Sequence, residues 1–258
     1  MRDKASVLTD LARAVAAQER QLPLPERLCH AAGTIMGARG VSLTIAYTAP
    51  HRVTLCSTDD GAARLEDLQD VLGQGPGPTA YRTGRQIRVV VGDPGTSGDA
   101  RWTQFDAAVL DAFGAVRITA IPIHPDGEVL GVLTCHQPAD SAPRLGEDTA
   151  QFLADAIGVA LLKDPDQLAT DLSGPWSSRA QIHQATGMVV AQLGISPDEA
   201  LALLRAHAFA YTWSLAQVAA SVVAGELNFT EPDPETDPTR RAPGAADTTQ
   251  KSDGTNQP

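Results

Sequence analysis

Residues 177–229 carry helix start and stop signals at spacings that predict three short helices. The first helix spans Ser177–Leu193 and is followed by Gly194, a residue suited to the left-handed turn that ends a helix. The second begins at "SPDE" (196–199), where the serine can cap, the proline suits the first helical position and the glutamate can complete a capping box. The third begins at "SLAQ" (214–217) in the same way. Because helices of roughly 10 to 17 residues are marginal in isolation, this segment predicts a packed three-helix bundle.

Each of these helices also places its apolar side chains along one side, as packing in a bundle requires. The three stripes are Ile182, Ala185, Val189 and Leu193; Leu201, Leu204 and Ala208; and Leu215, Val218, Ala219 and Val222. Gly225 follows the third helix and is expected to end it. No formal charge occurs between Arg179 and Asp198, so the module is too apolar for a linker and too polar for a membrane span.

The preceding residues alternate helical and strand patterns, which predicts an α+β domain. The expected helices are Arg2–Arg20, Leu24–Ala38, Gly61–Leu72, Arg101–Phe113 and Leu145–Leu162, and the expected strands include Val41–Tyr47 and Arg52–Ser57. The segment "AVRITAIPIHPDGEVLGVLTCHQ" (115–137) predicts a hairpin whose two Val- and Ile-rich runs are joined by Pro125-Asp126-Gly127. Helices that flank antiparallel strands favour a sheet covered by helices.

Composition limits the cellular context. The chain has 258 residues and a formal net charge of −11, which disfavours nonspecific attraction to DNA or anionic lipid. Three cysteines are too few and odd in number for a disulfide framework, which favours a reducing cytoplasm. No signal peptide pattern occurs, and no apolar stretch approaches the roughly 18 residues of a membrane span. We therefore expect a cytoplasmic protein with no membrane segment.

The final segment, 230–258, is expected to be a disordered tail. From Glu231 onward it holds no Val, Ile, Leu or aromatic residue, so it cannot bury enough surface to offset chain entropy. Its deletion should therefore leave stability nearly unchanged.

The three-helix segment resembles an ANTAR domain, the RNA-binding output module of bacterial antitermination regulators. The resemblance covers about 50 residues in register, and its motif positions are Arg179, Gln184-Ala185, Gly187-Met188, Ser196, Glu199-Ala200, Leu204-Arg205, Ala208, Leu215 and Val218-Ala219. It implies that the module binds stem-loops in nascent transcripts. The candidate RNA-binding residues are Arg179, His183, Gln184, Arg205 and His207.

The charge of this module departs from the usual pattern. Many ANTAR domains carry lysine where this chain has Thr186, and between residues 170 and 230 two arginines face four carboxylates. Phosphate neutralisation is therefore weak, whereas RNA loops can be read by stacking and by hydrogen bonds to unpaired bases. Tyr211 and Trp213 offer stacking groups, although packing against the other helices is the favoured interpretation for both.

The upstream domain is similar to a GAF domain. The resemblance rests on "LGQGPGPTAYRTGRQIRVVV" (72–91) and "ITAIPIHPDGEVLGVL" (118–133), and it implies a sensor that can hold a small molecule between sheet and loops. The residues that would line such a pocket are Tyr81, Trp102, Phe105 and Arg117, with ordinary packing as the alternative. The expected organisation is an N-terminal dimerisation helix (1–20), a GAF-like sensor (21–163), a linker (164–176), an ANTAR-like bundle (177–229) and the tail.

Several other site classes are not supported by the sequence, and we expect no metal, cofactor or catalytic residue. Cys29-His30 and Cys135-His136 look like metal half-sites. Neighbouring strand residues point to opposite faces, so Cys135 and His136 cannot easily share a metal, and free core cysteines are favoured. "GQGPG" (73–77) is not followed by the Gly-Lys-Ser/Thr of a P-loop.

Dimerisation and coupling complete the sequence-based hypothesis. The first helix places Val7, Leu11, Ala14 and Val15 along a stripe outside the expected sensor core, which predicts a homodimer through this helix. We expect Leu145–Leu162 to transmit the signal, with a flexible joint after it because Pro165 and "SGPW" (173–176) interrupt the helix. The chain is thus interpreted as a non-enzymatic antitermination regulator. The alternatives are a protein-interaction regulator that has lost RNA binding, and a GAF-fold thiol-dependent reductase.

Overall fold

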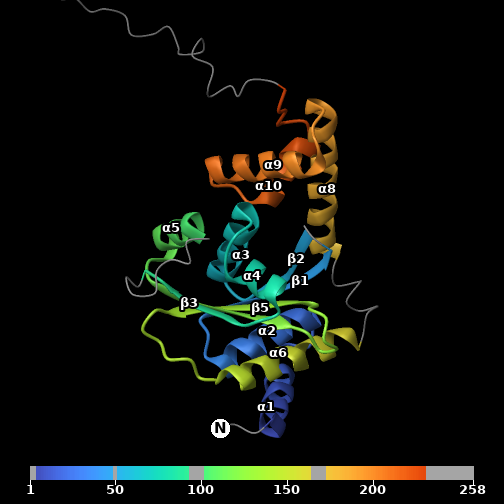
Figure 1. The fold of residues 1–258 in the computed structure, drawn as a ribbon. Coiled ribbons are helices and arrows are strands. Elements are labelled where there is room, and N and C mark those ends of the chain that lie inside the picture. Colours follow the sequence, from blue (N-terminus) through green and yellow to red (C-terminus); the bar gives the residue numbers. More distant parts are fainter. Residues whose placement is uncertain (1–3, 49–50, 93–101, 164–172, 231–258) are drawn as a thin grey trace, which may run out of the picture.

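The computed structural model describes residues 4–48, 51–92, 102–163 and 173–230. The predicted tail therefore lies almost entirely outside the described residues, as do Pro165 and most of the expected linker. The chain forms a helix-covered sheet with a three-helix bundle above it (Figure 1). The α+β fold class expected from the sequence is confirmed.

The sensor is built on a five-stranded antiparallel sheet in the order β2-β1-β5-β4-β3. Its strands are β1 (Gly40–Thr48), β2 (His51–Ser57), β3 (Ile87–Val91), β4 (Val116–Ile123) and β5 (Gly131–Pro138). The predicted hairpin is the β4–β5 pair, in which Ile123 lies opposite Gly131. The sheet thus joins strands from both halves of the sensor, with β5 at its centre between β1 and β4.

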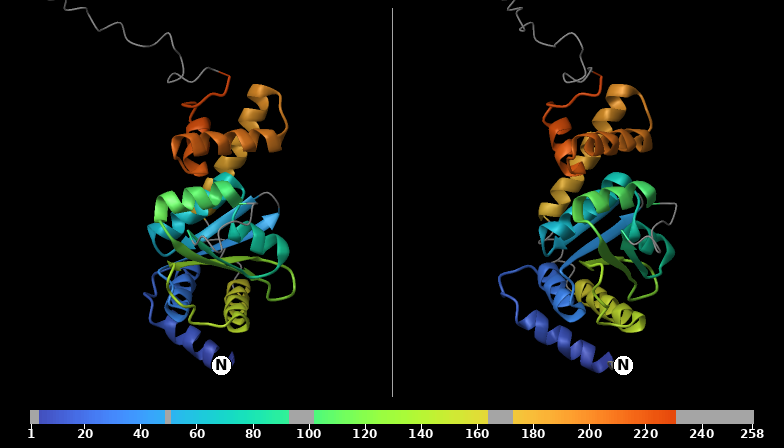
Figure 2. Two further views of the ribbon diagram at one scale, coloured as in Figure 1. Left: turned by 60° about the vertical axis from the view of Figure 1, so that its left-hand side comes forward. Right: turned by 90° about the vertical axis from the view of Figure 1, so that its left-hand side faces the viewer.

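Helices cover both faces of this sheet (Figures 1 and 2). Helices α2 (Leu24–Met36) and α6 (Glu147–Leu162) lie on one face, and α1 (Lys4–Ala16) packs on the outside of these two. Helices α3 (Asp60–Leu72), α4 (Pro76–Thr83) and α5 (Thr103–Phe113) lie on the other face. Strand alternation supplies a different surface to each side, because Val41, Leu43 and Ile45 join the α2–α6 core while Ser42 and Thr44 face α3.

The bundle consists of α8 (Ser173–Leu193), α9 (Pro197–Tyr211) and α10 (Leu215–Val223). Both predicted capping boxes are confirmed. The amide of Glu199 donates to Ser196 Oγ at 3.3 Å while the Ser196 amide donates to Glu199 Oε2 at 2.8 Å. Ser214 and Gln217 repeat the arrangement at the start of α10. Gly194 adopts φ 67°, the left-handed conformation expected after the first helix.

Three local expectations differ from the structure. Helix α8 begins at Ser173, so "SGPW" lies inside it rather than interrupting it, since proline is tolerated in a first helical turn. Leu193 is 36% exposed, because it lies at the end of α8 and outside the buried stripe. Val7 and Leu11 of α1 are buried in the chain's own core, so this stripe already has a partner in α2 and α6.

The cysteines also differ from expectation. Cys29 on α2 and Cys56 on β2 form a disulfide, and Cys135 on β5 is the free cysteine. The favoured interpretation of Cys29 as a free core cysteine was therefore wrong, although its burial was expected. The pairing arises because α2 packs across β2, which brings together positions separated by 27 residues.

Within the described ranges, no single helix has both the length and the apolar composition to cross a bilayer. One bent pair, Ala180–Leu193 of α8 with α9, meets these criteria together by length and composition, with a bend of 107°.

Candidate functional site

Two candidate RNA-binding residues of the bundle lie exposed on α8. His183 and Gln184 both present their side chains at the surface, next to Ala185, which is buried in the bundle core. Arg179 belongs to the same helix, but its side chain lies outside the described residues. The structure therefore provides one polar surface on α8, close in sequence to the motif positions predicted for RNA contact.

The other two candidates, Arg205 and His207, lie on different faces of α9. Residues four positions apart share a helix face, so Arg205 groups with Phe209, whereas His207 groups with Tyr211. The His207 ring packs 4.4 Å from the Tyr211 ring, centroid to centroid. The structure therefore does not bring Arg205 and His207 to a common surface, and the two residues face different neighbours.

The His207 face of α9 carries an aromatic cluster. The rings of Trp213 and Phe229 lie edge-on to His207 at centroid distances of 6.0 and 5.7 Å. Trp213 nevertheless keeps 39% of its surface exposed. The packing interpretation of Tyr211 and Trp213 is consistent with this cluster, and Trp213 still offers an exposed aromatic surface that can stack on an unpaired base.

The Arg205 face of α9 lies against the sensor. Val71, at the end of α3, is buried within the same apolar cluster as the bundle residues Leu204 and Val218. Arg205 Nε is completely buried, and a Cβ placed on Gly73 would lie 3.8 Å from the guanidinium Nη1 of Arg205. Figure 1 shows α9 lying across the end of α3. The sensor and the bundle thus share part of one core.

A groove of about 360 Å³ runs beside this contact, between α3, α5 and α9. The sensor contributes Arg64 and Asp67, and the bundle contributes Phe209 and Trp213. Burial raises the pKa of the Asp67 carboxyl, and the neighbouring Arg64 opposes that shift. Partial burial makes the ionised form of the Asp67 carboxyl unfavourable. The stability of this domain contact therefore depends on whether Asp67 is charged.

Within the sensor, a buried polar cluster lies between α3 and the sheet. Ser42 Oγ donates to Glu66 Oε1 at 2.7 Å, and Thr44 Oγ1 donates to Glu66 Oε2 at 3.3 Å. Gln69 lies one turn further along α3, and Thr134 is paired with Ser42 in the sheet. All of these side chains are 2% exposed or less. The contact between α3 and β1 is therefore polar at this point.

Two buried polar atoms of this cluster have no hydrogen-bond partner among the described residues, namely Gln69 Nε2 and Thr134 Oγ1. Gln69 is held by its other atom, since its Oε1 accepts from the Gly77 amide at 2.6 Å. That contact requires glycine at position 75, where φ is 126° and an added Cβ would lie 2.9 Å from Gln69 Oε1. The "GQGPG" motif therefore brings the backbone of α4 onto Gln69.

The four predicted ligand-binding residues lie in three places. Trp102 and Phe105 are buried together in a core with α3, and Tyr81 packs partly buried beside Ala120 and Val132. Arg117 lies on the opposite sheet face from its neighbour Ile118, and it donates to the carbonyls of Ser141 and Ala139 at 2.8 Å each. Their role in ligand binding stays a prediction.

The polar cluster was not predicted from the sequence, although the sequence contains two patterns that point to it. Ser42 and Thr44 alternate with apolar residues in a central strand, and Glu66 and Gln69 are three apart on a helix. Alternating polar residues are typical of a strand face exposed to solvent. The sequence alone therefore did not show that α3 buries this face.

No group of three or more His, Cys, Asp or Glu side chains in the described ranges could hold a metal ion. All three cysteines are buried, and burial raises the pKa of the Cys135 thiol to about 12.

Comparison with known families agrees with this two-part architecture. The GAF domain model matches residues 26–161, and the ANTAR domain model matches residues 171–223. The chain is a GAF-domain protein that also carries an ANTAR domain. The resemblance stated from the sequence is thereby confirmed. GAF and ANTAR domains are typically sensory and regulatory, so this GAF–ANTAR protein combines a sensor with a regulatory module.

Solved structures similar to the GAF–ANTAR protein include three GAF-domain proteins, whereas no curated protein matches it. The GAF-B domain of DevS from Mycobacterium smegmatis is 16% identical, with 57% of this chain and 96% of that chain covered and a TM-score of 0.38. A GAF domain/HD domain protein from Geobacter sulfurreducens is 15% identical, with 57% and 97% covered and a TM-score of 0.40. The GAF domain of a phosphoenolpyruvate-protein phosphotransferase from Coxiella burnetii is 15% identical, with 64% and 96% covered and a TM-score of 0.39.

Proposed function

We propose that this protein is a signal-responsive regulator that binds hairpin loops in nascent RNA through its ANTAR domain and acts by transcription antitermination. The ANTAR match over residues 171–223 carries the proposal. The exposed side chains of His183, Gln184 and Trp213 support it, because they can hydrogen-bond or stack on unpaired bases. Since nascent RNA is the target, the proposal places the protein in the cytoplasm.

The charge of the module indicates which part of an RNA hairpin it reads. With two arginines against four carboxylates between residues 170 and 230, phosphate contacts are few. Affinity for a paired stem rests on such contacts, whereas loop readout depends on base edges and stacking. We therefore infer that the loop sequence, rather than the stem, determines binding.

The test starts with RNA crosslinked to the full-length protein in its native cell. A recovered hairpin is then compared with the same stem carrying a different loop. Binding should require the recovered loop, and the affinity should fall with salt by a shallow slope of about one or two counterions. If the protein binds no recovered hairpin, the RNA-binding proposal fails and a protein-interaction regulator becomes the better interpretation.

Substitutions locate the contact. Arg179→Ala should weaken hairpin binding by about 5- to 150-fold, as expected for loss of one bidentate arginine contact. The double change His183→Ala with Gln184→Ala should weaken it without unfolding the bundle, since both side chains are exposed. Arg82→Ala is the matched control, because it removes an exposed arginine from sensor helix α4. If Arg82→Ala weakened hairpin binding as much as Arg179→Ala, the loss would be due to the overall charge of the protein.

We also propose that the sensor responds to a small polar ligand bound near Gln69 and Thr134. The two partnerless polar atoms of these side chains support this location. Isothermal titration of candidate metabolites against wild type and Thr134→Val measures it. A ligand that binds both proteins equally would place the sensing site elsewhere.

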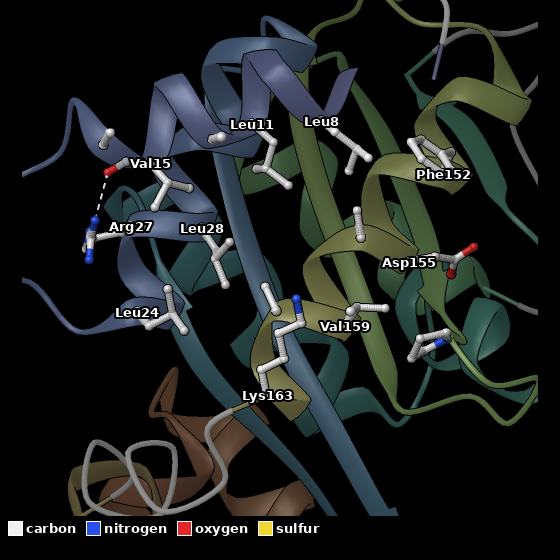
Figure 3. Close-up of a pocket in the computed structure, with 15 residues that line it drawn as sticks. Leu8, Leu11, Val15, Leu24, Arg27, Leu28, Phe152, Asp155, Val159 and Lys163 are labelled. Atoms are coloured by element: carbon white, nitrogen blue, oxygen red, sulfur yellow. Dashed lines mark hydrogen bonds between the residues drawn. The ribbon is translucent and has the colours of Figure 1, made fainter. Parts of the chain in front are cut away.

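A homodimer forms part of the proposal, through an apolar groove between α1, α2 and α6. The groove has a volume of about 820 Å³, and Leu8 and Val159 on its walls are 47% and 43% exposed (Figure 3). Its proposed occupant is α1 of a second copy. Because Leu8 itself lines the groove, two-fold pairing would bury Leu8 of each copy on the other.

Mass measurement in solution tests the dimer. Leu8→Asp should yield monomers at micromolar concentration, whereas Thr9→Asp, an exposed neighbour on the same helix, should remain dimeric. A monomeric wild-type protein at these concentrations would rule the dimer out.

A further inference from the structure

Helix α3 connects the two candidate sites because its two faces contact different parts of the molecule. Glu66 and Gln69 share the face that points into the buried polar cluster of the sheet. Asp67 and Val71, four residues apart, share the face that meets the bundle. Figure 1 shows α3 standing between the sheet and α9. One rigid helix therefore touches both the sensor interior and the output module.

The bundle side of this contact includes the predicted RNA-binding residue Arg205. Its Nε is completely buried, and it shares its face of α9 with Phe209, which lines the groove against α3 and α5. An arginine with its guanidinium held at a domain contact cannot at the same time form a bidentate contact with a base or phosphate. In this arrangement, one of the two arginines of the module is therefore not accessible to RNA.

We propose that the carboxyl-terminal turn of α3, through Val71, is an intramolecular docking surface for the ANTAR bundle that competes with RNA for the Arg205 face of α9. The proposal rests on the RNA-binding function proposed above and adds its regulation. Undocking frees the Arg205 face. A ligand bound at the cluster of Glu66 and Gln69 would move α3 and so shift the balance between the docked and free states.

Helix α6 has no comparable contact in its described packing, which joins it to β4, α1 and α2. This matters because the sequence pointed to residues 145–162 as the coupling element. The proposal assigns that role to α3, whose Val71 is buried in the core of the bundle.

The proposal predicts that weaker docking raises RNA affinity and that stronger docking lowers it. If only the undocked fraction binds, the apparent dissociation constant equals the intrinsic one divided by that fraction. Val71→Asp places a carboxylate in the shared apolar cluster and should undock the bundle. Hairpin affinity should then rise by about tenfold relative to wild type. Asp67→Asn removes a charge from the contact, so it should strengthen docking and lower hairpin affinity.

The experiment measures docking and RNA binding separately on the full-length protein. Small-angle scattering reports docking, because the radius of gyration rises when the bundle separates from the sensor. Fluorescence anisotropy with a hairpin recovered by crosslinking reports RNA affinity. Ala63→Asp is the matched control, since it adds the same carboxylate to an exposed position of α3. This control should match wild type in both measurements.

The expected result is that Val71→Asp expands the protein and binds the hairpin more tightly than wild type. Expansion with unchanged or weaker binding would overturn the competition and leave RNA binding itself intact. No expansion in a folded Val71→Asp variant would overturn the docking role of Val71. Absence of hairpin binding by wild type and by the expanded variant would overturn both this proposal and the proposed function.

Folding of the variants is checked by circular dichroism. If Val71→Asp fails to fold, Val71→Ala and Asp67→Asn carry the test. The alanine variant should bind the hairpin more tightly than wild type and the asparagine variant less tightly. The same direction of change in both variants would overturn the proposal.

Discussion

Asp59 Oδ1 lies 3.1 Å from Nε2 of His136 and also accepts the amide of Ala62 at 2.7 Å. One carboxylate therefore caps the start of α3 and fixes it to β5. The His136 side chain is only 6% exposed, so the contact is shielded from solvent on that side. Helix α3 is consequently held at its start by the sheet, along its length by Glu66, and at its end by the bundle.

Asp59→Ala is predicted to destabilise the protein, because it removes the N-cap and the partner of His136 together. Loss of an N-cap typically costs about 0.5–2 kcal/mol of stability. Asp59→Asn retains a capping oxygen and should lose less. Urea unfolding of both variants measures the difference, and equal stability of the alanine variant and wild type would show that this anchor contributes nothing.

The two capping boxes of the bundle form a matched pair for a pH experiment. Hydrogen bonds from Ser196 lower the pKa of the Glu199 carboxyl from its ordinary value of 4.5. A lowered pKa means that stabilisation is complete above 4.5 and is lost as pH falls through the lower folded value. Ser196→Ala should therefore destabilise the protein at pH 7 and destabilise it less in acid.

Ser214→Ala is the control for this prediction, because its box partner is Gln217, which does not titrate. Its cost should be similar at pH 7 and should not shrink below pH 4.5. Thermal unfolding of both variants across pH gives the two profiles. Parallel profiles for both variants would contradict a role for Glu199 ionisation.

Asp67 predicts the opposite pH dependence at the domain contact. Burial raises its pKa above the ordinary value of 3.8, with Arg64 opposing and Glu66 reinforcing the shift. Asp111 lines the same groove and adds a further carboxylate there. Because the folded pKa is raised, the contribution of Asp67 is most favourable below 3.8 and declines as pH rises through the folded value.

Asp67→Asn should therefore stabilise the protein at neutral pH, where the ionised carboxylate is unfavourable. Each 1 kcal/mol would raise the Tm by about 2–4 °C in a protein of this size. Differential scanning calorimetry at pH 7 and near pH 4 measures both the gain and its decrease in acid. A variant less stable than wild type at pH 7 would refute this assignment.

The cysteine pairing predicts a thiol count. Under denaturing conditions without reductant, one thiol per chain should react, that of Cys135, because Cys29 and Cys56 are paired. After reduction, all three cysteines should react. Three reactive thiols before reduction would disprove the disulfide in the isolated protein. In the native state Cys135 should stay unreactive at neutral pH, since its pKa is about 12.

Features that depend on neighbouring residues were predictable from the sequence. The capping boxes at Ser196 and Ser214 and the left-handed Gly194 were identified correctly, because each depends on groups within a few positions. The β4–β5 hairpin was equally accessible, since a short turn brings adjacent strands together. The ANTAR and GAF resemblances rested on motifs that are continuous in the chain.

The exposed part of the candidate RNA surface was partly predictable. His183 and Gln184 were predicted because their side chains can stack on or hydrogen-bond to unpaired bases, and both are exposed. Arg205 was predicted from the resemblance to ANTAR domains, yet it is partly buried. The apolar stripe of α9 predicts which face meets α8 and α10, but it contains no information about the sensor that covers another face.

The sequence by itself determined the two-part organisation, the three-helix bundle with its helix caps and helix ends, and the antiparallel sheet. Only the tertiary structure decided that Val71 joins the core of the bundle, that Cys29 pairs with Cys56, and that the polar side chains of Ser42 and Glu66 meet in the interior. The physical reason is that helix caps and turns arise from local hydrogen bonds. Contacts between distant segments depend instead on how whole elements pack, because one amphipathic pattern is compatible with several partners.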